Sequence, residues 1–362
     1  MITILIPTYN RPNRLRRLLD YYNKYGKGLN IIVADSSSNE SKKLNKNIIS
    51  KFPKLDILYI DKYSPTIGLF HKLSDALNYV NTKYCVVCAD DDFITPNGII
   101  KSVNFLENNE DFSVAQGHYI SFHFKNEDKR EQKFYWNFPA YLDKSITFPE
   151  AESRLAFHLS NYQLTTFYAV HRTDLLKVIF KDTVKYTDDG NFGELLSSVL
   201  ALIYGKMKHM DVLYDVRETI IDSDGKTSKS LNDFLKDKTY KKKYNKFRDC
   251  LVEHLIKNSQ MNSDEAKELI DKAMSVYLKK SYYKSFKRVL IGKTSNLLDV
   301  LDLPESIDKN IRILYKKIFT PRYVLNRSKE IEDFKNTIES QDSKYFNDFE
   351  RIRKHVLLHA KK

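Results

Sequence analysis

A short apolar segment that ends in three consecutive acids constrains the fold of this chain more than any other feature. Residues 85–93 read Cys-Val-Val-Cys-Ala-Asp-Asp-Asp-Phe, so Asp90, Asp91 and Asp92 directly follow the apolar run. Apolar residues without alternation are typical of a strand that is covered on both faces, as in a parallel sheet flanked by helices. In open α/β sheets, ligands bind beyond the carboxyl ends of such strands. The segment therefore predicts an α/β fold with a site at these acids.

The three carboxylates also indicate which kind of ligand this site takes. Adjacent acids repel one another unless a cation lies among them, and hard oxygen ligands favour Mg²⁺ or Mn²⁺. Mg²⁺ usually takes one or two protein carboxylates and completes its coordination with water and substrate phosphates. The pattern favours a site for a metal-bound phosphate compound. The alternative is a solvated acidic turn that closes the strand, because Asp is a common turn residue.

The preceding part of the chain alternates strand-like and helix-like segments. Strands are predicted at residues 1–10, 31–34, 57–60 and 84–88, and helices from Pro12 towards Gly26, at 67–80 and at 96–108. Apolar residues of the first helix recur at helical spacing and give it one apolar face. Alternation of this kind predicts a mainly parallel, Rossmann-like sheet with right-handed crossovers.

With these segments in this order, residues 1–229 resemble the family-2 glycosyltransferases, which are nucleotide-sugar enzymes of the GT-A fold. The resemblance rests on four segments whose order and spacing match: Ile4-Leu5-Ile6-Pro7-Thr8-Tyr9-Asn10-Arg11, Ile31-Ile32-Val33-Ala34-Asp35, Thr66-Ile67-Gly68 and Ala89-Asp90-Asp91-Asp92. It implies a GT-A catalytic domain, a nucleotide-sugar donor, expected to be a UDP-sugar, and Mn²⁺ or Mg²⁺ as cofactor.

The resemblance also assigns roles on the donor side. In the family the first loop holds the nucleotide, and the acid after the second strand pairs with the base. The Asp-x-Asp element binds the cation that bridges the diphosphate, which here means Asp90 and Asp92. The residues expected at the nucleotide sugar are Pro7, Thr8, Asn10, Arg11, Asp35, Gly68, Asp90 and Asp91. The family often shows Asp-Asp-Gly-Ser after the second strand, whereas this chain has Asp35-Ser36-Ser37-Ser38, so only the first acid is kept.

Two basic residues are further candidates for contact with the diphosphate. Lys72 lies one turn into the helix that follows Gly68, where the alternative is a solvated surface lysine. Arg217 follows a strand expected near residues 211–216 and matches a recurrent arginine of the family. The sequence contains neither G-x-G-x-x-G nor G-x-x-x-x-G-K-[ST], so side chains and metal are expected to hold the phosphates.

The candidates for the catalytic base lie near the end of the predicted domain. The family carries an acidic pair before an apolar helix and a Gly-Lys turn after it, and the acid serves as base. Adjacent acids select Asp188 and Asp189, whereas the distance to Gly205-Lys206 selects Glu194. We expect Asp189 to be the base because a loop side chain can point into a cleft. Glu194, which helix capping alone would also explain, is the rival.

Aromatic residues follow two further strands expected at 112–116 and 119–124. Tyr135, Trp136 and Phe138 would either stack on a sugar of the substrate or belong to the core.

The positive charge of the chain is concentrated in its C-terminal third. The formal net charge is +13, and residues 241–362 hold 28 Lys and Arg against 17 Asp and Glu. Helical periodicity replaces alternation there, so residues 230–362 are expected to form a basic helical region. Within it, residues 277–290 form a basic amphipathic segment that would either contact an anionic membrane or pack its apolar stripe on the domain.

Cysteine usage and hydropathy indicate the compartment. Cys85 and Cys88 form a C-x-x-C, but positions three apart in a strand face opposite sides, so a redox or zinc site is not expected. No signal peptide and no apolar run near 18 residues is present. We expect a cytoplasmic protein, in peripheral contact with the inner face of the membrane at most.

Together these observations predict a metal-dependent, inverting glycosyltransferase that acts on a cell-surface glycan or a lipid-linked acceptor, without a nucleic-acid partner. One alternative is a sugar nucleotidyltransferase, although the segment after the first strand lacks the glycine-rich loop expected there. The other is a non-catalytic glycan- or nucleotide-binding module on the same scaffold, against which the retained acids argue.

Overall fold

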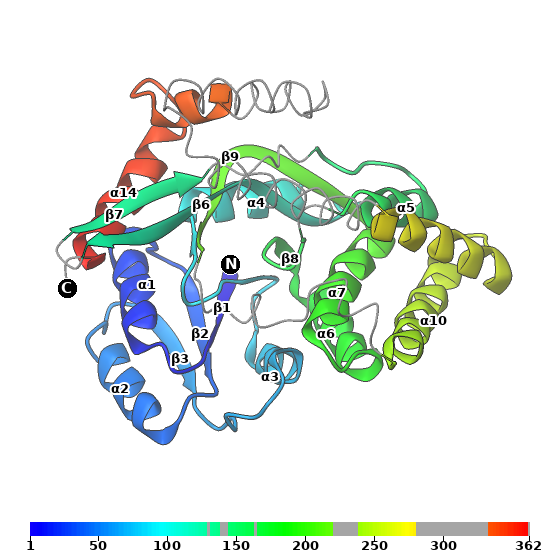
Figure 1. Cartoon of the computed structure of the whole chain (residues 1–362), viewed down its shortest axis with the longest axis horizontal. Coiled ribbons are helices and arrows are strands. Elements are labelled where there is room, and N and C mark those ends of the chain that lie inside the picture. Colours follow the sequence, from blue (N-terminus) through cyan, green and yellow to red (C-terminus); the bar gives the residue numbers. More distant parts are fainter. Residues whose placement is uncertain (129–130, 138–143, 163–164, 220–237, 280–331, 361–362) are drawn as a thin grey trace, which may run out of the picture.

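The chain forms one α/β structure around a central sheet (Figure 1). A computed structural model describes residues 1–128, 131–137, 144–162, 165–219, 238–279 and 332–360, and of residues 124–137 the backbone alone. The α/β class with a mainly parallel sheet, predicted from the alternation of segments, is confirmed.

The sheet has nine strands in the order β3-β2-β1-β4-β8-β6-β9-β5, and β7 pairs with the second half of β6. Among these described strands six run in one direction, and β5, β7 and β8 run in the other. Their bounds are β1 (Ile2–Thr8), β2 (Asn30–Asp35), β3 (Asp56–Ile60), β4 (Tyr84–Val87), β5 (Phe93–Ile94), β6 (Phe112–Asp128), β7 (Glu131–Asn137), β8 (Val170–Arg172) and β9 (Lys206–Glu218).

The register places the functional strand ends together. Thr8 at the end of β1 lies opposite Asp35 at the end of β2, and Leu5 lies opposite Val87 of β4. Because parallel strands bring their carboxyl ends to one edge of the sheet, the loops after β1, β2 and β4 meet there.

Helices cover both faces of the sheet. One face carries α1 (Pro12–Tyr25), α2 (Asn39–Ile49), α4 (Pro96–Glu107) and α14 (Phe346–Ala360). The other face carries α3 (Leu69–Ala76), α5 (Ala151–Ser160), α6 (Thr173–Tyr186), α7 (Gly190–Tyr204) and α10 (Tyr240–Asn258). Cys85 and Cys88 point into these two different layers, as expected for a strand, and both are free thiols.

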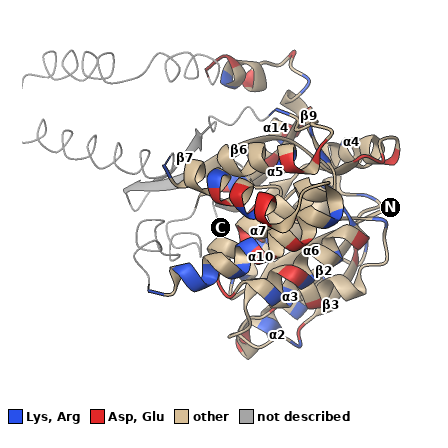
Figure 2. Ribbon diagram, turned by 90° about the vertical axis from the view of Figure 1, so that its right-hand side faces the viewer, with Lys and Arg blue, Asp and Glu red and all other residues tan. Residues whose placement is uncertain are grey.

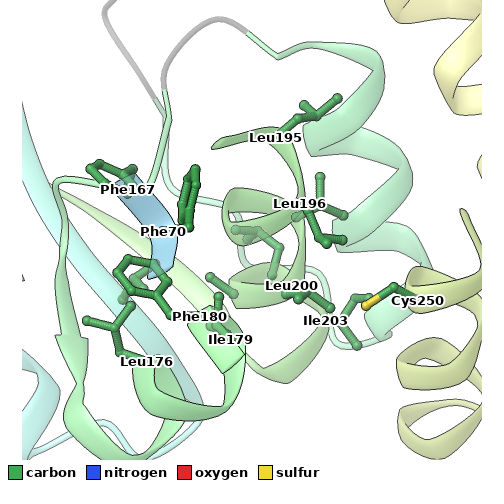
Figure 3. Close-up of a cluster of buried hydrophobic side chains, with 14 of the residues drawn as sticks. Phe70, Phe167, Leu176, Ile179, Phe180, Leu195, Leu196, Leu200, Ile203 and Cys250 are labelled. Carbon is green, nitrogen blue, oxygen red and sulfur yellow. The ribbon is translucent and has the colours of Figure 1, made fainter. Parts of the chain in front are cut away.

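Aromatic packing sets the distance between α3 and α7. The ring of Phe70 lies 5.7 Å from those of Phe167 and Phe180, and Leu196 and Leu200 of α7 continue the same layer (Figure 3). A Cβ on Gly193 would lie 2.3 Å from the ring of Phe70, so only glycine allows this approach. The close packing holds the first turn of α7 against α3, near the edge where the strands end.

The described C-terminal helices pack onto both layers. Phe247, Cys250 and Leu255 of α10 join the layer of α7, and so does the helix at residues 263–279. Residues 332–339 also form a helix, and α14 buries Phe349, Ile352 and Val356 against α1. The expected boundary between residues 229 and 230 lies outside the described residues. The division into two domains stays a prediction, as does the membrane-contact segment, since residues 280–331 lie outside the description.

Two details differ from the sequence-based expectation. The segments 112–116 and 119–124 belong to one strand, β6, whose pairing with β9 shifts register around Gln116 and His118. The helices α2 and α5 were not predicted from the sequence. None of the helices in the described part of the chain combines the length and apolar character of a membrane-spanning segment.

Candidate active site

A cavity of about 340 Å³ lies at the edge of the sheet where β1 and β4 end. It combines acidic, basic and aromatic side chains from segments far apart in the sequence. Its lining residues are Pro7, Thr8, Tyr9, Arg11, Leu69, Phe70, Lys72, Ala89, Asp90, Asp91, Asp92, Phe167, Tyr168, Gly190, Asn191, Glu194, Arg217 and Glu218. The predicted acids therefore line a cavity and do not form a solvated turn.

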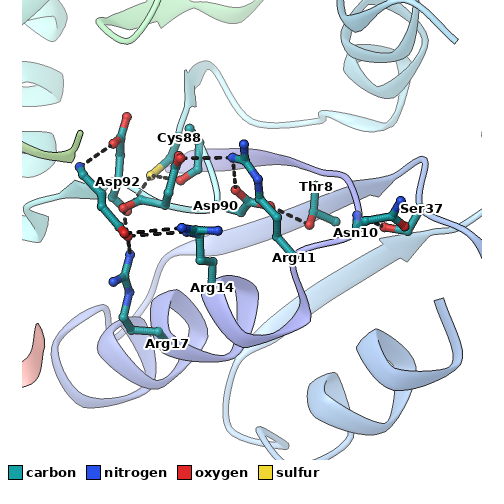
Figure 4. A network of polar contacts seen from close by, with 12 residues as sticks. Thr8, Asn10, Arg11, Arg14, Arg17, Ser37, Cys88, Asp90 and Asp92 are labelled. Carbon is teal, nitrogen blue, oxygen red and sulfur yellow. Dashed lines mark hydrogen bonds and ion pairs between the residues drawn. The ribbon is translucent and has the colours of Figure 1, made fainter. Parts of the chain in front are cut away.

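The acids after β4 are buried on the floor of the cavity. Asp90, Asp91 and Asp92 are 3%, 7% and 2% exposed. Asp90 accepts a hydrogen bond of 2.7 Å from Thr8 Oγ1, and Arg11 lies between Asp90 and Asp91, at 3.4 Å and 3.0 Å from their carboxylates (Figure 4). The first loop and the acidic loop thus hold each other in place.

A second set of contacts joins the acids to the end of β9. Arg217 Nε donates to Asp92 Oδ2 at 3.2 Å, and the backbone N–H of Glu218 donates to Asp92 Oδ1 at 3.1 Å. The guanidinium of Arg217 also lies 4.6 Å from the ring centroid of Tyr168, a cation–π arrangement. Arg217, which was expected from its resemblance to a recurrent arginine of the family, lines the cavity.

Three arginines at the beginning of α1 form a ladder towards the acidic loop and Glu218. Arg14 and Arg17 are three residues apart on one face of α1, and Arg11 directly precedes the helix. Arg17 donates to the backbone carbonyl of Asp91 at 3.0 Å and lies 2.5 Å from Glu218, which Arg14 also contacts (Figure 4). The roles of Arg14, Arg17 and Glu218 were missed, although the i, i+3, i+6 spacing of the arginines was a signal.

The carboxylates of the site bind their protons tightly. Burial, and then the neighbouring Asp91, raise the pKa of Asp90 to about 6. Burial likewise raises the pKa of Asp92 well above its ordinary value, although Arg217 opposes the shift. Asp215 on β9 is fully buried, neither of its oxygens has a hydrogen-bond partner, and burial raises its pKa to about 7. Arg11 and Arg217 thus offset the effect of burial on Asp90 and Asp92 only in part.

The carboxylate oxygens of Asp90 and Asp92 suit a hard divalent cation as ligands. Each oxygen of Asp90 and Asp92 accepts one hydrogen bond, which leaves a lone pair on each oxygen for a metal. In the described part of the chain these acids do not converge as a group of three ligands. A cation at Asp90 and Asp92 would therefore keep positions open for water or phosphate oxygens, as is usual for Mg²⁺.

Lys72 is buried, in contrast to a solvated surface lysine. It is 4% exposed, and its Nζ lies 3.1 Å from the carbonyl oxygen of Thr8 and 2.8 Å from Ser36 Oγ. The ammonium group therefore joins the loops after β1 and β2 and lines the cavity.

Asp35 lies beneath the site and not on its wall. It is fully buried; its Oδ1 accepts from the backbone N–H of Ser37, and its Oδ2 accepts from Asn45 and Tyr59, each at 2.7 Å. Ser37 Oγ in turn accepts from the backbone N–H of Asn10 at 2.8 Å. In this arrangement Asp35 supports the loop after β1. Contact between Asp35 and the base of a nucleotide would require the hydrogen-bond partners of Asp35 to move. Its predicted role stays a prediction.

Asn10 and Gly68 lie beside the cavity without lining it. Asn10 adopts a left-handed backbone with φ of 53°, a conformation that Asn tolerates better than most residues, and its Oδ1 accepts from the N–H of Ser38 at 2.9 Å. Gly68 caps the N-terminus of α3, which carries Phe70 and Lys72. Both residues shape the loops that hold the lining residues.

The structure separates the three candidates for the base. The Asp189 side chain caps α7 by accepting from the N–H of Phe192 at 2.9 Å, and its other oxygen lies 3.4 Å from Lys243. Asp188 is exposed and also faces Lys243, at 3.5 Å. Neither lines the cavity, whereas Glu194 does. The sequence led us to expect Asp189 as the base, whereas the geometry favours Glu194.

Glu194 of α7 lines the cavity together with the acidic loop. Its side chain is open to the cavity, yet protein surrounds it on the other sides, and this burial raises the pKa of its carboxyl. The hydroxyl of Tyr162 donates to it at 3.3 Å. A second cavity of about 160 Å³ shares Asn191 and Glu194 with the first and is otherwise lined by Tyr162, Phe192, Leu195, Met274 and Tyr277. Glu194 therefore lies between a polar cavity and an aromatic one.

The side chains of Tyr135, Trp136 and Phe138 lie outside the described residues. Their predicted stacking on a sugar stays a prediction.

Comparison with known proteins gives a family match for the N-terminal part of the chain and identifies the fold. Residues 3–173 match the family model described as Glycosyl transferase family 2, a range that includes β1, β2, β4 and the acidic loop. No curated protein sequence matches the chain significantly.

Among solved structures, residues 1–349 of TarS from S. aureus, in complex with UDP-GlcNAc, give a TM-score of 0.53 at 14% identity, over 77% of this chain and 72% of that chain. The full TarS structure gives 0.49 at 15% identity, over 76% of this chain and 43% of TarS. The mannosyltransferase PcManGT from Pyrobaculum calidifontis, in complex with GDP-Man and Mn²⁺, gives 0.41 at 13% identity, over 82% and 79%. The first likeness identifies the GT-A fold.

Proposed function

We propose a metal-dependent, inverting sugar transfer for this chain, whose residues 3–173 belong to glycosyl transferase family 2. The family and the fold identify a glycosyltransferase. The observation that carries the finer proposal is the cavity itself. Its lining combines the acidic loop, Arg11 and Lys72 with the carboxylate of Glu194 from α7, which supports a donor site and a base in one cavity.

The acidic side suits the diphosphate of a nucleotide-sugar donor. Asp90 and Asp92 would hold Mn²⁺ or Mg²⁺, which when bound supplies Lewis-acid neutralisation of the departing diphosphate. Arg11, Lys72 and Arg217 lie around the same space and offer N–H donors for phosphate oxygens. Pro7 and Thr8 form the neighbouring wall, and Asn10 and Asp35 fix their loop. We take a UDP-sugar as the first donor to test.

Glu194 is the proposed catalytic base. The acceptor hydroxyl loses its proton to the Glu194 carboxylate while its oxygen forms a bond to the anomeric carbon of the donor. The bond from that carbon to the diphosphate breaks, and the nucleoside diphosphate leaves with the electron pair. The hydroxyl of Tyr162, 3.3 Å from the carboxylate, keeps Glu194 oriented. A raised pKa makes the carboxylate a better base near neutral pH.

The second cavity is the proposed approach for the acceptor. The rings of Tyr162 and Tyr277 line this cavity and offer apolar faces, which suit the apolar face of a sugar ring. Because the cavity shares Glu194 with the first, a sugar bound there presents its hydroxyl to the base. This supports a glycan or a sugar carried on a lipid as the acceptor.

The basic C-terminal region supports a further proposal, reversible contact with an anionic membrane surface at the cytoplasmic face. In the described part, Lys241 and Lys242 are exposed in the first turn of α10, whose basic residues are blue in Figure 2. Each basic residue near such a surface contributes about 1 kcal/mol. We expect the protein to co-sediment with vesicles of anionic lipid at low salt and to remain in solution at high salt. If the protein does not sediment with the vesicles at low salt, the positive charge of the C-terminal region serves solubility alone.

A donor-hydrolysis screen tests the proposed function. The full-length protein is incubated with common sugar nucleotides and Mn²⁺, and release of the nucleoside diphosphate is measured. We expect slow hydrolysis of one donor, absent in excess chelator and in Asp92→Asn. If no sugar nucleotide is hydrolysed or bound, the chain is a module on a transferase scaffold.

A further inference from the structure

A second group of metal-ligand side chains lies away from the cavity, where α14 packs on α1. Asp20 of α1 and His355 and His359 of α14 bring one ligand atom each to within 4.8 Å of one another. Among the residues that the structure describes, this is the one such group of three or more His, Cys, Asp or Glu. Nothing in the proposed sugar transfer uses these residues.

Helix geometry explains why the three side chains meet. His355 and His359 are four residues apart and therefore share one face of α14. That face packs on α1, as Phe349 and Val356 do, and α14 lies directly beside α1 (Figure 1). The ring of His355 also contacts those of Tyr21 and Phe93, at 5.7 Å and 5.9 Å. These contacts hold the histidine against Asp20 independently of any ligand.

The hydrogen bond of His355 selects the tautomer that a metal site needs. Nε2 of His355 lies 2.9 Å from the backbone carbonyl of Arg17, and since a carbonyl only accepts, this nitrogen carries the proton. Nδ1 then keeps its lone pair and lies 3.8 Å from Asp20 Oδ2. Metal-binding histidines are commonly held in this way, with the other ring N–H bonded to a carbonyl or carboxylate. His359 Nε2 lies 3.1 Å from the same Asp20 oxygen, so this nitrogen donates a proton to the carboxylate, and a bound metal ion would replace that proton.

We propose that Asp20, His355 and His359 form a Zn²⁺ site that ties the C-terminal helix α14 to α1. Two imidazole nitrogens and one carboxylate are a ligand set of Zn²⁺, which prefers four-fold tetrahedral coordination. Asp20 and His359 line a surface hollow, from which water would supply the fourth ligand.

Nearby positive charges set a limit on the affinity. Lys24 contacts Asp20 Oδ2 at 2.8 Å, and Arg16 and Lys51 line the same hollow. The Lys24 side chain is 40% exposed, so it can leave Asp20 for solvent, and exposed ion pairs of this kind contribute little stability. The basic neighbours lower the affinity for a cation without blocking the ligand atoms.

The site would act on the part of α1 that serves the cavity. The backbone carbonyl of Arg17 accepts the hydrogen bond from His355. The side chain of Arg17 contacts the backbone carbonyl of Asp91 and the carboxylate of Glu218. Zn²⁺ at Asp20, His355 and His359 would therefore stabilise both the C-terminal helix and the arginine ladder. Binding to the folded state alone raises the melting temperature with metal concentration.

Metal titration of the full-length chain, without a polyhistidine tag and stripped with chelator, tests the proposal. Excess Mg²⁺ is present throughout so that the acidic loop is saturated. Co²⁺ reports ligation by nitrogen through visible absorption, and Zn²⁺ competes for its site. We expect one equivalent of Co²⁺ to bind with tetrahedral absorption, Zn²⁺ to displace it, and Zn²⁺ to raise the melting temperature.

Three variants make the test specific. His359→Ala should abolish the Co²⁺ absorption and the Zn²⁺-dependent rise in melting temperature, and Asp20→Asn should weaken binding at least about tenfold. His71→Ala, which removes an exposed histidine of α3, should change neither. If His359→Ala fails to fold, Asp20→Asn still decides, because an amide preserves the hydrogen bonds. Absence of stoichiometric binding to the unmodified chain, or unchanged binding in Asp20→Asn, would leave an Asp–His ion pair only and overturn the proposal.

Discussion

The loop after β4 and the loop before α7 each carry adjacent acids, and the two loops hold them in different surroundings. Asp90, Asp91 and Asp92 are buried among arginines at the carboxyl end of a parallel strand. Asp188 and Asp189 stand at the beginning of a helix, where Lys243 and the backbone N–H of Phe192 satisfy them. The comparison teaches that acids at a strand end meet other loops, whereas acids before a helix are engaged by that helix.

The largest expected effect is at the buried loop. Asp92→Asn should lower turnover by at least about 10³-fold, because metal charge stabilisation amounts to several kcal/mol and each 1.4 kcal/mol is a factor of ten. Transfer rates and circular dichroism check activity and fold together. Asp111→Asn, which alters an exposed acid paired with Lys206, is the control and should keep full turnover. Full activity of Asp92→Asn, or of the unmodified protein in excess chelator, would remove the metal from the account.

The next effect separates the two loops on the catalytic side. Glu194→Gln should lose about 10²- to 10⁴-fold in turnover with donor affinity unchanged, since it removes the general base but no donor contact. Asp189→Ala should keep near-normal turnover and lose about 0.5–2 kcal/mol of unfolding free energy, because it removes a helix cap. Steady-state kinetics and urea unfolding measure the two quantities. If Asp189→Ala is inactive and Glu194→Gln is active, the base is Asp189, and if both are active the inverting mechanism is wrong.

Asp35 tests whether a buried acid can act through its loop. Asp35→Ala leaves Ser37, Asn45 and Tyr59 without their shared acceptor, so nucleotide binding should weaken by about 1–3 kcal/mol. Tyr59→Phe removes one of these donors and should have a smaller effect. Dissociation constants for the nucleoside diphosphate provide the measurement. If Asp35→Ala binds the nucleoside diphosphate with unchanged affinity, Asp35 and its loop do not contribute to the nucleotide site.

The smallest expected effect is the dependence of Mn²⁺ affinity and turnover on pH, which compares Asp90 of the acidic loop with Glu194 of α7. The pKa of Asp90 is raised to about 6, and its carboxylate binds a cation only when ionised. Affinity for Mn²⁺ should therefore be constant above that value and fall as pH decreases through it, by about tenfold for each further unit. Glu194 is also active only when ionised, and its raised pKa places the loss of turnover above pH 4.5. Mn²⁺ affinity that stays constant from pH 8 to 5 would contradict the assignment.

Local patterns predicted several of the residues that meet at the cavity, whose role at a donor stays a prediction. Short apolar runs and the order of motifs predicted β4 and its three acids, the loop from Pro7 to Arg11 and the position of Arg217. Such patterns are local, so a short segment of sequence is enough to recognise them. Burial of Lys72 and of Asp35 could not be predicted, because it depends on Ser36, Asn45 and Tyr59 in other elements.

The preference for Glu194 over Asp189 depends on where α7 lies, and no local pattern specifies this. Contact between Gly193 and Phe70 places that helix, and it joins segments more than a hundred residues apart in the sequence. The contact of α14 with α1 is more distant still, since His355 and Arg17 are separated by 338 positions. Amphipathic periodicity predicts that such a helix packs, but not on which partner.

Titration calorimetry of the full-length protein with UDP and with GDP, each with and without Mn²⁺, tests the central claim most directly. We predict that one nucleoside diphosphate binds at one equivalent in the presence of Mn²⁺, and that chelator or Asp92→Asn removes this binding. Equal affinity with and without the cation, or no binding of either nucleotide to a folded protein, would contradict a metal-dependent donor site at the acidic loop.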